Sequence, residues 1–355
     1  MLDRQRPGCN LFTVIVFAAA LAPAGLPAAS LADGTAQPSE GSQAVLDRLW
    51  TAEQLRTAPA DGRMKRLRPA DHTPPEALPG EAGTANGAAE PTATKPAPPT
   101  GSIRRIAPAA GDRPVALTFD LCERADQLTA YDGAVIDVLR REKAPATFFA
   151  GGKWMRDHPE RAMQLIADPL FQVGNHGWTH GNLRVMDAEK TEQQIAWTQR
   201  EFAVLRAALA GRAAEAGVPA DEIARLPQQP TALRFPYGVC SPRSLEVAAS
   251  HGLAAIQWDV ISGDASRAAT PSQLMHTVLG DARPGSIIVF HANGNGHGTA
   301  EALPQIIAGL RGKGFRLVTI DELLRPGEPA AATDCYELRP GDNQRYDRLF
   351  GEGTG

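Results

Sequence analysis

Short, almost continuous apolar runs alternate with longer amphipathic segments from residue 113 to residue 324. Such runs are typical of parallel strands that helices cover on both faces. A strand followed by a helix, repeated about seven times, is the pattern of a βα barrel, one unit short of the usual eight. The predicted strands are 114–119, 146–150, 171–175, 232–235, 254–258, 286–290 and 315–320, and the predicted helices are 130–142, 159–167, 187–216, 242–251, 271–281 and 299–312.

The first residues predict an export signal. Arg4 and Arg6 precede a short apolar run at 11–22, and Ser30-Leu31-Ala32 is a suitable cleavage site. Because this run is too short for a comfortable membrane span, we expect export to the periplasm or the medium. No transmembrane span is then expected after signal removal; an uncleaved anchor is the alternative.

The region between the signal and the barrel predicts a linker. Residues 69–111 are rich in Ala, Pro, Thr and Gly and cannot bury enough apolar surface to offset the entropy of ordering. An apolar stripe within 42–55 predicts one short helix there. The predicted parts are a signal at 1–32, a linker at 33–112, the barrel domain at 113–327 and an extension at 328–355, loosely packed or disordered.

Composition narrows the class of protein. The chain has 355 residues, 43% of them hydrophobic, which allows a large core, and its formal net charge of −4 offers no basic surface for nucleic acid. We expect a monomer. Export leaves Cys122, Cys240 and Cys335, so one disulfide and one further thiol are the simplest outcome.

Two histidines follow the third predicted strand. His176 and His180 are four residues apart, which places them on one face of a helical turn, where both rings can meet one ion. Gly174 and Gly177 allow the backbone to bend close to a bound group. On its own such a pair is more often ordinary surface or core.

Polar residues also end most of the other predicted strands, where a βα barrel carries its reactive groups. Together with the histidines they indicate metal-assisted hydrolysis, in which an ion activates water and polarises a carbonyl. Asp120 could take the proton of the water, His291 could protonate the leaving group, and backbone N–H groups near Tyr237 could bind the oxyanion. Each has an alternative: a helix cap for Asp120, a structural ion pair for Arg234, a rim histidine for His291 and loop turns for Asp259 and Asp264.

Five short motifs follow one another along the domain in the same order as in a known family. Thr118-Phe119-Asp120-Leu121, His176 with His180, Arg234-Phe235-Pro236-Tyr237, Asp264 and His291 resemble the motifs of the NodB-homology, or polysaccharide deacetylase, domain of the carbohydrate esterase 4 family. The resemblance implies a distorted (β/α)7 barrel of the glycoside hydrolase and deacetylase type. It also implies a divalent metal, usually zinc, and the removal of acetyl groups from amino-sugar glycans.

The chain departs from that pattern at the first motif. The family has a second aspartate that binds metal, and here this position is Leu121. The resemblance leaves the role of base with Asp120. Glu123 is the nearest replacement ligand, a Cys122 thiolate is another unless it is oxidised, and Asp120 itself could bind the metal while another group serves as base. Gly177, Ile261 and Ala265 also differ from the family's motifs.

The sequence therefore favours an exported, metal-dependent hydrolase that deacetylates an N-acetylated glycan, such as peptidoglycan, a chitin-like oligosaccharide or an exopolysaccharide. Two alternatives stay open, an O-acetyl polysaccharide esterase and a glycan-binding pseudoenzyme of the same fold. The predicted site comprises the catalytic residues Asp120, His291, Arg234, Tyr237 and Asp264, and the metal ligands His176, His180 and Glu123.

A disulfide between Cys122 and Cys240 is a further prediction. Cys122 lies two residues past Asp120 and Cys240 three past Tyr237, so both cysteines belong to the barrel rim if Asp120 and Tyr237 face one site. In an oxidising compartment they could pair.

Overall fold

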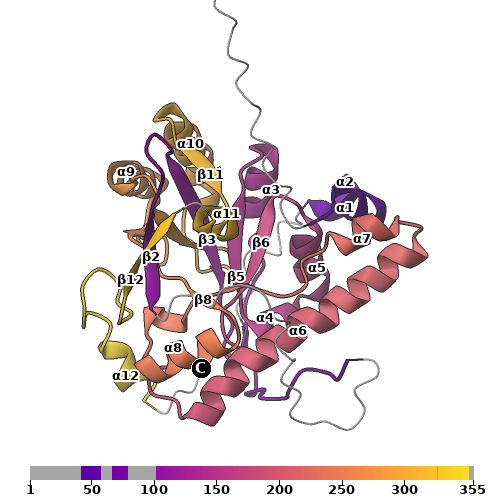
Figure 1. Cartoon of the computed structure of the whole chain (residues 1–355), viewed down its shortest axis with the longest axis horizontal. Helices are drawn as coiled ribbons and strands as arrows, with labels where there is room; N and C mark the ends of the chain where they lie inside the picture. Colours follow the sequence, from indigo (N-terminus) through magenta and orange to yellow (C-terminus); the bar gives the residue numbers. More distant parts are fainter. Residues whose placement is uncertain (1–40, 57–65, 79–100, 326, 352–355) are drawn as a thin grey trace, which may run out of the picture. The chain divides into compact units, whose positions relative to one another are not determined.

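A parallel, curled sheet forms the centre of the molecule (Figure 1). The computed structural model describes residues 41–56, 66–78, 101–325 and 327–351, so the predicted signal at 1–32 lies outside the described residues. The strand order is β8-β7-β6-β5-β3-β10-β9, and β11 pairs with the first half of β3. Within the described residues the eight strands are β3 (Pro114–Leu121), β5 (Ala146–Ala150), β6 (Phe171–Asn175), β7 (Ala232–Leu233), β8 (Ala254–Ala255), β9 (Val260–Ile261), β10 (Ile287–His291) and β11 (Arg316–Val318).

Helices surround this sheet in two groups. The pair formed by α9 and α10 lies on one side with α3, and the long helix α6 packs on α4, α5 and α8 on the other (Figure 1). This arrangement confirms the predicted distorted (β/α)7 barrel. The helices are α1 (Gln43–Leu49), α2 (Ala52–Leu55), α3 (Gly133–Arg141), α4 (Gly152–Asp157), α5 (Pro159–Ala167), α6 (Ala188–Glu215), α7 (Ala220–Ala224), α8 (Pro242–Ser250), α9 (Pro271–Asp281), α10 (Thr299–Gly312), α11 (Ile320–Leu324) and α12 (Arg345–Leu349).

Side chains alternate across β3, which separates two cores. Leu117, Phe119 and Leu121 are buried in the large apolar cluster between the sheet and its helices. Ala116 belongs to a second cluster, inside the curl of the sheet, with residues of β10 such as Ile287. Because successive residues of a strand point to opposite faces, Asp120 lies on the inner side, at the carboxyl end of β3.

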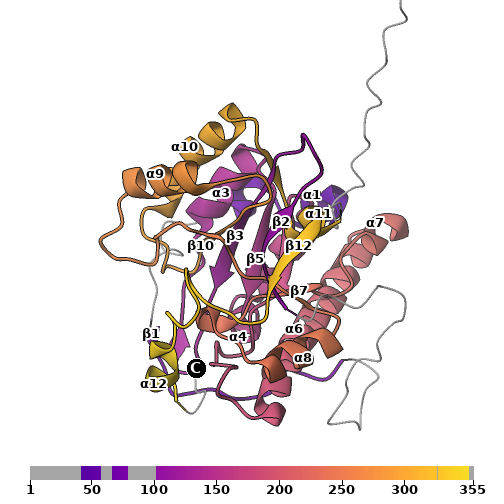
Figure 2. The ribbon, with the colours of Figure 1, turned by 60° about the vertical axis from the view of Figure 1, so that its left-hand side comes forward.

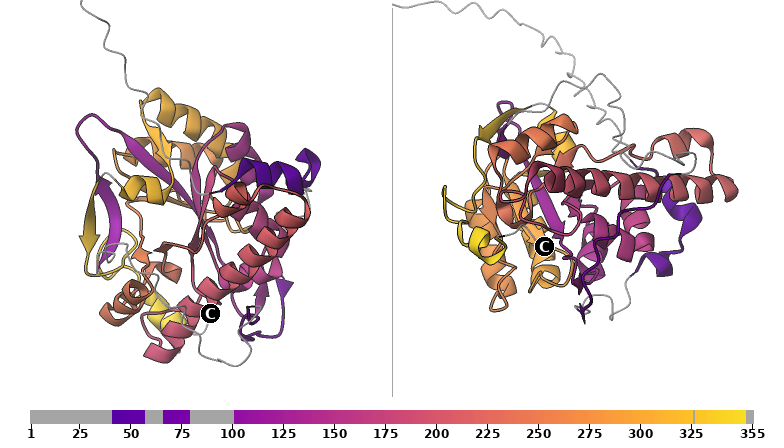
Figure 3. Two further views of the ribbon diagram at one scale, coloured as in Figure 1. Left: turned by 45° about the vertical axis from the view of Figure 1, so that its right-hand side comes forward. Right: turned by 90° about the horizontal axis from the view of Figure 1, so that it is seen from below.

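The folded unit begins earlier in the chain than predicted. Val45, Leu46 and Trp50 are buried in the main apolar cluster, where α1 packs on α5, α6 and α7 (Figure 3, left). Ser42 caps α1 by accepting from the Val45 backbone N–H at 3.2 Å. The predicted short helix is therefore present, but it is part of the barrel domain and not of a linker.

The segments on either side of the predicted domain pair with each other in a two-stranded antiparallel ribbon. The strand β2 (Ser102–Ala107) pairs antiparallel with β12 (Glu328–Ala332), as Figure 2 shows. Ile103 and Ile106 of β2 are buried in the inner apolar cluster. A second short ribbon joins β1 (Arg66–Leu67) and β4 (Gln127–Leu128). The segments at 102–107 and 328–332, predicted as linker and loose extension, are thus held by strand pairing.

No helix in the described part of the chain is both long and apolar enough to span a membrane.

Candidate active site

The predicted site residues meet at the carboxyl ends of the central strands. Asp120 lies near the end of β3 and is the register partner of His291, which ends β10. Asn175 of β6 is the register partner of Leu233 of β7, so the next residues, His176 and Arg234, are neighbours as well. The parallel arrangement therefore brings four motifs from distant parts of the sequence to one rim.

His176 is held in a single tautomer. Its Nδ1 lies 2.8 Å from the backbone carbonyl oxygen of Arg234. Because a carbonyl oxygen can only accept, Nδ1 carries the proton and donates it, which leaves the lone pair on Nε2. Burial lowers the pKa of His176, so the ring is neutral near pH 7. A neutral imidazole with a fixed second nitrogen is the form that binds metals.

His180 reaches the same place through an irregular loop. Gly177 has φ of 74° and His180 has φ of 55°, and no described helix lies between β6 and α6. The ring centroids of His176 and His180 are 4.9 Å apart. The prediction that they share the face of a helical turn is wrong, although they do meet. A left-handed conformation is strained for histidine, as is common at functional sites.

Asp120 and Arg234 form a buried ion pair. Arg234 Nη1 donates to Asp120 Oδ1 at 2.8 Å, and the Arg234 side chain also donates to backbone carbonyls of Ile256 and Gln257. Burial alone would raise the pKa of Asp120, but Arg234, followed by His176 and His291, more than offsets this, and the pKa is lowered. Asp120 is therefore ionised at neutral pH and is held in one orientation.

His291 has its own carboxylate partner. Its Nδ1 lies 2.9 Å from Asp264 Oδ1, and its backbone N–H donates to Asp264 Oδ2 at 2.7 Å. Thr299 Oγ1 also donates to Asp264, at 2.9 Å. Burial lowers the pKa of His291, but Asp264 outweighs burial and the pKa is raised. The pair therefore favours a protonated imidazole whose Nε2 remains available.

The three residues after Asp120 separate in space. Leu121 is buried in the outer apolar cluster, whereas Cys122 Sγ lies 3.4 Å from His176 Nε2. Glu123, predicted as a metal ligand, accepts from Lys153 Nζ at 2.9 Å and from the Thr129 backbone N–H at 2.6 Å. In the described residues Glu123 does not join the groups of clustered donors, so the structure contradicts its assignment as a ligand.

The donor atoms suit a divalent metal. Those of Cys122, His176 and His180 all lie within 4.8 Å of one another, and those of Asp120, Cys122 and His291 form a second such group. Imidazole and thiolate ligands suit zinc and related ions. The fixed lone pair of His176 is a second reason that the residues fit a metal.

Tyr237 lies beside the histidines in a strained turn. It has φ of 59° within the short 3-10 turn Pro236–Gly238, and its ring centroid is 4.4 Å from that of His180. The rings of Tyr346 and Phe350, at 5.2 and 4.3 Å between centroids, cover its other side. Burial raises the pKa of Tyr237. Tyr346 and Phe350, in the segment predicted as a loose extension, therefore pack on the rim.

The disulfide joins Cys240 to Cys335, with a Cα–Cα distance of 5.3 Å. The predicted Cys122–Cys240 bridge is wrong. After β12 the chain returns to the rim, where the buried Asn343 donates to the carbonyls of Gly238 and Cys335. This return brings Cys335 next to Cys240, and Cys122 lies outside the bridge.

Comparisons with known proteins agree with this geometry. The family described as Polysaccharide deacetylase matches residues 107–210. The chitooligosaccharide deacetylase of Sinorhizobium fredii is 31% identical over 192 residues, which are 51% of this chain and 80% of that protein. The peptidoglycan-N-acetylglucosamine deacetylase of Bacillus cereus is 29% identical over 213 residues, which are 59% of this chain and 68% of that protein.

A solved structure shows the same fold. It is a mutant of a carbohydrate esterase 4 family pseudoenzyme with restored enzymatic activity, and the wild-type protein comes from Bacillus anthracis. It is 25% identical with a TM-score of 0.51, over 64% of this chain and 72% of that one. Motifs, fold and relatives agree, and the chain belongs to the polysaccharide deacetylase family, the NodB-homology domains of carbohydrate esterase 4.

Proposed function

We propose that the protein is an exported, metal-dependent hydrolase that removes acetyl groups from an N-acetylated glycan, such as peptidoglycan, a chitin-like oligosaccharide or an exopolysaccharide. One observation carries the proposal. Asp120 and His291 are register partners on adjacent strands, and each is held by its own buried partner. Their donor group and that of the two histidines share Cys122, and Asp120 Oδ2 lies 3.8 Å from His176 Nε2. The names of the relatives support an N-acetylated glycan as the substrate class.

The two residues divide the proton transfers. Asp120, kept ionised by Arg234, accepts a proton from the water that attacks the acetamide carbonyl carbon. His291, whose pKa Asp264 raises, donates a proton to the nitrogen as the carbon–nitrogen bond breaks. The products are acetate and a free amino sugar. Arg234 and Asp264 act by positioning and charge.

His176 and His180 would hold the metal, together with a third donor from the same rim. Such an ion, when bound, lowers the pKa of water and polarises a carbonyl oxygen. We assign the developing oxyanion to the backbone N–H of Tyr237, because the N–H groups of Gly238 and Val239 already donate to the carbonyls of Phe235 and Pro236. The strained φ of Tyr237 supports this, since it aims the backbone of the turn differently from an ordinary extended segment.

Export is inferred from two independent features. Residues 1–32 have the composition of a signal peptide. The Cys240–Cys335 disulfide belongs to an oxidising compartment and is rare in a reducing cytosol. The test is to recover the protein from the periplasm and the medium and to sequence its mature N-terminus from tryptic fragments. We expect the chain to begin just after Ala32.

The decisive assay is acetate release by zinc-loaded protein from chitin oligomers and from peptidoglycan, measured for wild type and Asp120→Asn. We expect the variant to keep its metal and to lose about a hundredfold or more in rate, the range for loss of a general base. Asp126→Asn is the matched control, because Asp126 lies on the loop after β3 and pairs with Arg124 at 3.2 Å. Loss of metal in Asp120→Asn would instead make Asp120 a ligand.

Two other functions are outcomes of the same assay. Acetate released from acetylated xylan, but not from either N-acetylated glycan, would identify an O-acetyl esterase. A glycan-binding pseudoenzyme is favoured by one observation, the Leu121 that replaces the family's metal-binding aspartate. Binding of zinc and chitin oligomers without acetate release from any substrate would establish that alternative.

A further inference from the structure

The geometry of β3 turns the side chain of Leu121 away from the candidate metal site. The strand β3 continues through Leu121, which pairs with Ala150 of β5. Its side chain therefore points to the outer face, into the apolar cluster with Phe119, where a carboxylate would be buried without a partner. The next inward-facing position after Asp120 is residue 122. Besides Asp120, the inward-facing donor at the end of β3 is therefore Cys122.

The distances suit a metal ligand. Tetrahedral zinc with a sulfur at about 2.3 Å and a nitrogen at about 2.0–2.1 Å has a ligand-to-ligand separation of about 3.5 Å. Cys122 Sγ lies 3.4 Å from His176 Nε2, the nitrogen that carries the lone pair. His180 completes the group, with all donor atoms within 4.8 Å of one another.

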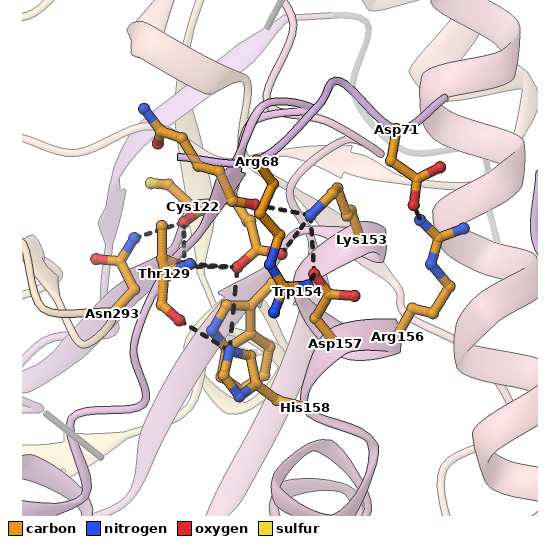
Figure 4. A network of polar contacts seen from close by, with 12 residues as sticks. Arg68, Asp71, Cys122, Thr129, Lys153, Trp154, Arg156, Asp157, His158 and Asn293 are labelled. Carbon is orange, nitrogen blue, oxygen red and sulfur yellow. Dashed lines mark hydrogen bonds and ion pairs between the residues drawn. The ribbon is translucent and has the colours of Figure 1, made fainter. Parts of the chain in front are cut away.

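The backbone of Cys122 is held firmly in place. Its carbonyl oxygen accepts from Asn293 Nδ2 at 2.6 Å and from Thr129 Oγ1 at 3.0 Å (Figure 4). The next residue, Glu123, accepts from the buried Lys153, which also donates to Asp157 at 2.8 Å. Anchors of this kind fix a ligand before metal arrives and are typical of the groups around metal sites.

The competing donors are already engaged. The Glu123 carboxylate is bound by Lys153, by the Thr129 backbone N–H and by the Thr129 hydroxyl at 3.0 Å. Asp120 is the stronger competitor, because its Oδ2 lies 3.8 Å from His176 Nε2. Its Oδ1, however, is committed to Arg234, and the proposed mechanism needs the Asp120 carboxylate to take the proton of the water.

We propose that Cys122, as a thiolate, is the third protein ligand of the metal, with His176 and His180, and takes the place of the family's second aspartate. The Cys240–Cys335 disulfide is compatible with this role, because it leaves Cys122 outside the bridge in an oxidising compartment. A thiolate also favours zinc over the harder ions that oxygen ligands prefer. The inference rests on the proposed function only in placing a metal at this rim.

The test uses zinc-loaded mature protein with its disulfide intact and X-ray absorption at the zinc edge. We expect one sulfur neighbour at about 2.3 Å in wild type. Cys122→Ser should lose that sulfur neighbour and bind zinc more weakly by a factor of at least about a hundred. That is more than the loss expected when a residue only hydrogen-bonds to a metal ligand. Cys122→Asp should recover zinc without sulfur, and Asp126→Asn, the matched control on the loop after β3, should keep both zinc and sulfur.

The wild-type spectrum decides the question even if a variant does not fold. One bound zinc without a sulfur neighbour would overturn the inference, and loss of zinc in Asp120→Asn would then identify Asp120 as the ligand. In that case the proposed deacetylase function would stand, and its assignment of the base to Asp120 would fall. Wild-type protein that binds no zinc at all would overturn this inference and the metal dependence of the proposed function together.

Discussion

Replacing Trp50 by alanine should destabilise the protein strongly, although this residue precedes the catalytic domain as the sequence defines it. The Trp50 side chain is 4% exposed and packs in the main apolar cluster. Its indole N–H donates to Glu160, and the Arg212 guanidinium lies 5.3 Å from its ring centroid. The substitution therefore opens a cavity and leaves a carboxylate without one of its donors.

The expected cost is about 3–5 kcal/mol, the usual range for removing a buried tryptophan. At roughly 2 °C per kcal/mol for a domain of about 250 residues, the melting temperature should fall by about 6–10 °C. Urea unfolding of the mature protein, followed by circular dichroism, should show a lower midpoint with an unchanged slope.

Asp47→Ala is the matched control, since Asp47 is exposed on α1, the helix that ends just before Trp50, and its loss should stay within about 0.5 kcal/mol. Acetate release per folded molecule should be equal in both variants, because α1 packs on α5, α6 and α7, away from the strand ends that carry the site. A Trp50→Ala protein as stable as the control would show that the early helix does not dock on the barrel in solution.

Three further outcomes are expected. His176→Ala should lose most of its bound zinc by elemental analysis, whereas His276→Ala, on the distant helix α9, should not; equal zinc in both would refute the site. The disulfide joins two cysteines 95 residues apart in the sequence. Replacing both, with Cys240→Ser and Cys335→Ser, should lower the free energy of unfolding in urea by about 2–5 kcal/mol, and an unchanged value would contradict the bridge. Burial raises the pKa of Glu201 to about 7, so stability should be lost as pH rises from about 4.5 through 7. Glu201→Gln should abolish that loss, about 2 kcal/mol between about pH 5 and 8, and an unchanged pH dependence would refute it.

The central strands were predictable because they are buried on both faces. The ranges 146–150 and 171–175 coincide with β5 and β6. The later strands were less predictable. Of the predicted strand at 254–258 only Ala254–Ala255 is a strand, β8, and the sequence gives no separate signal for β9. Strands of two residues carry too little apolar patterning to be separated from the loops beside them.

Segments whose partners are distant in sequence were misjudged. The stripe of α1 is visible in the sequence, but its burial depends on α5, α6 and α7, which follow much later in the chain. The pairing of Cys240 with Cys335 depends in the same way on β12 and on the return of the chain after it. Apolar periodicity reports that a helix has a face to bury, and not which element covers it.

The candidate site shows the same division between local pattern and distant contact. The motif order correctly grouped Asp120, His176, Arg234 and His291, since parallel strands place their carboxyl ends together. Closeness in sequence favours Glu123 as a ligand, but the buried Lys153, from the helix α4 that follows β5, binds its carboxylate instead.

Strand alternation by itself distinguishes Cys122 from both of its neighbours. If Asp120 faces the site at the end of a regular strand, Leu121 must face the opposite layer and residue 122 must face the site again. The apolar character of Leu117, Phe119 and Leu121 indicates that layer, because all three belong to one buried cluster. If Cys122 binds the metal as we propose, the missing aspartate at 121 does not by itself remove the metal site. The same alternation that buries Leu121 turns the Cys122 sulfur toward His176. With Cys122 as the proposed ligand, the strand keeps a donor at its end and only the residue that supplies it differs.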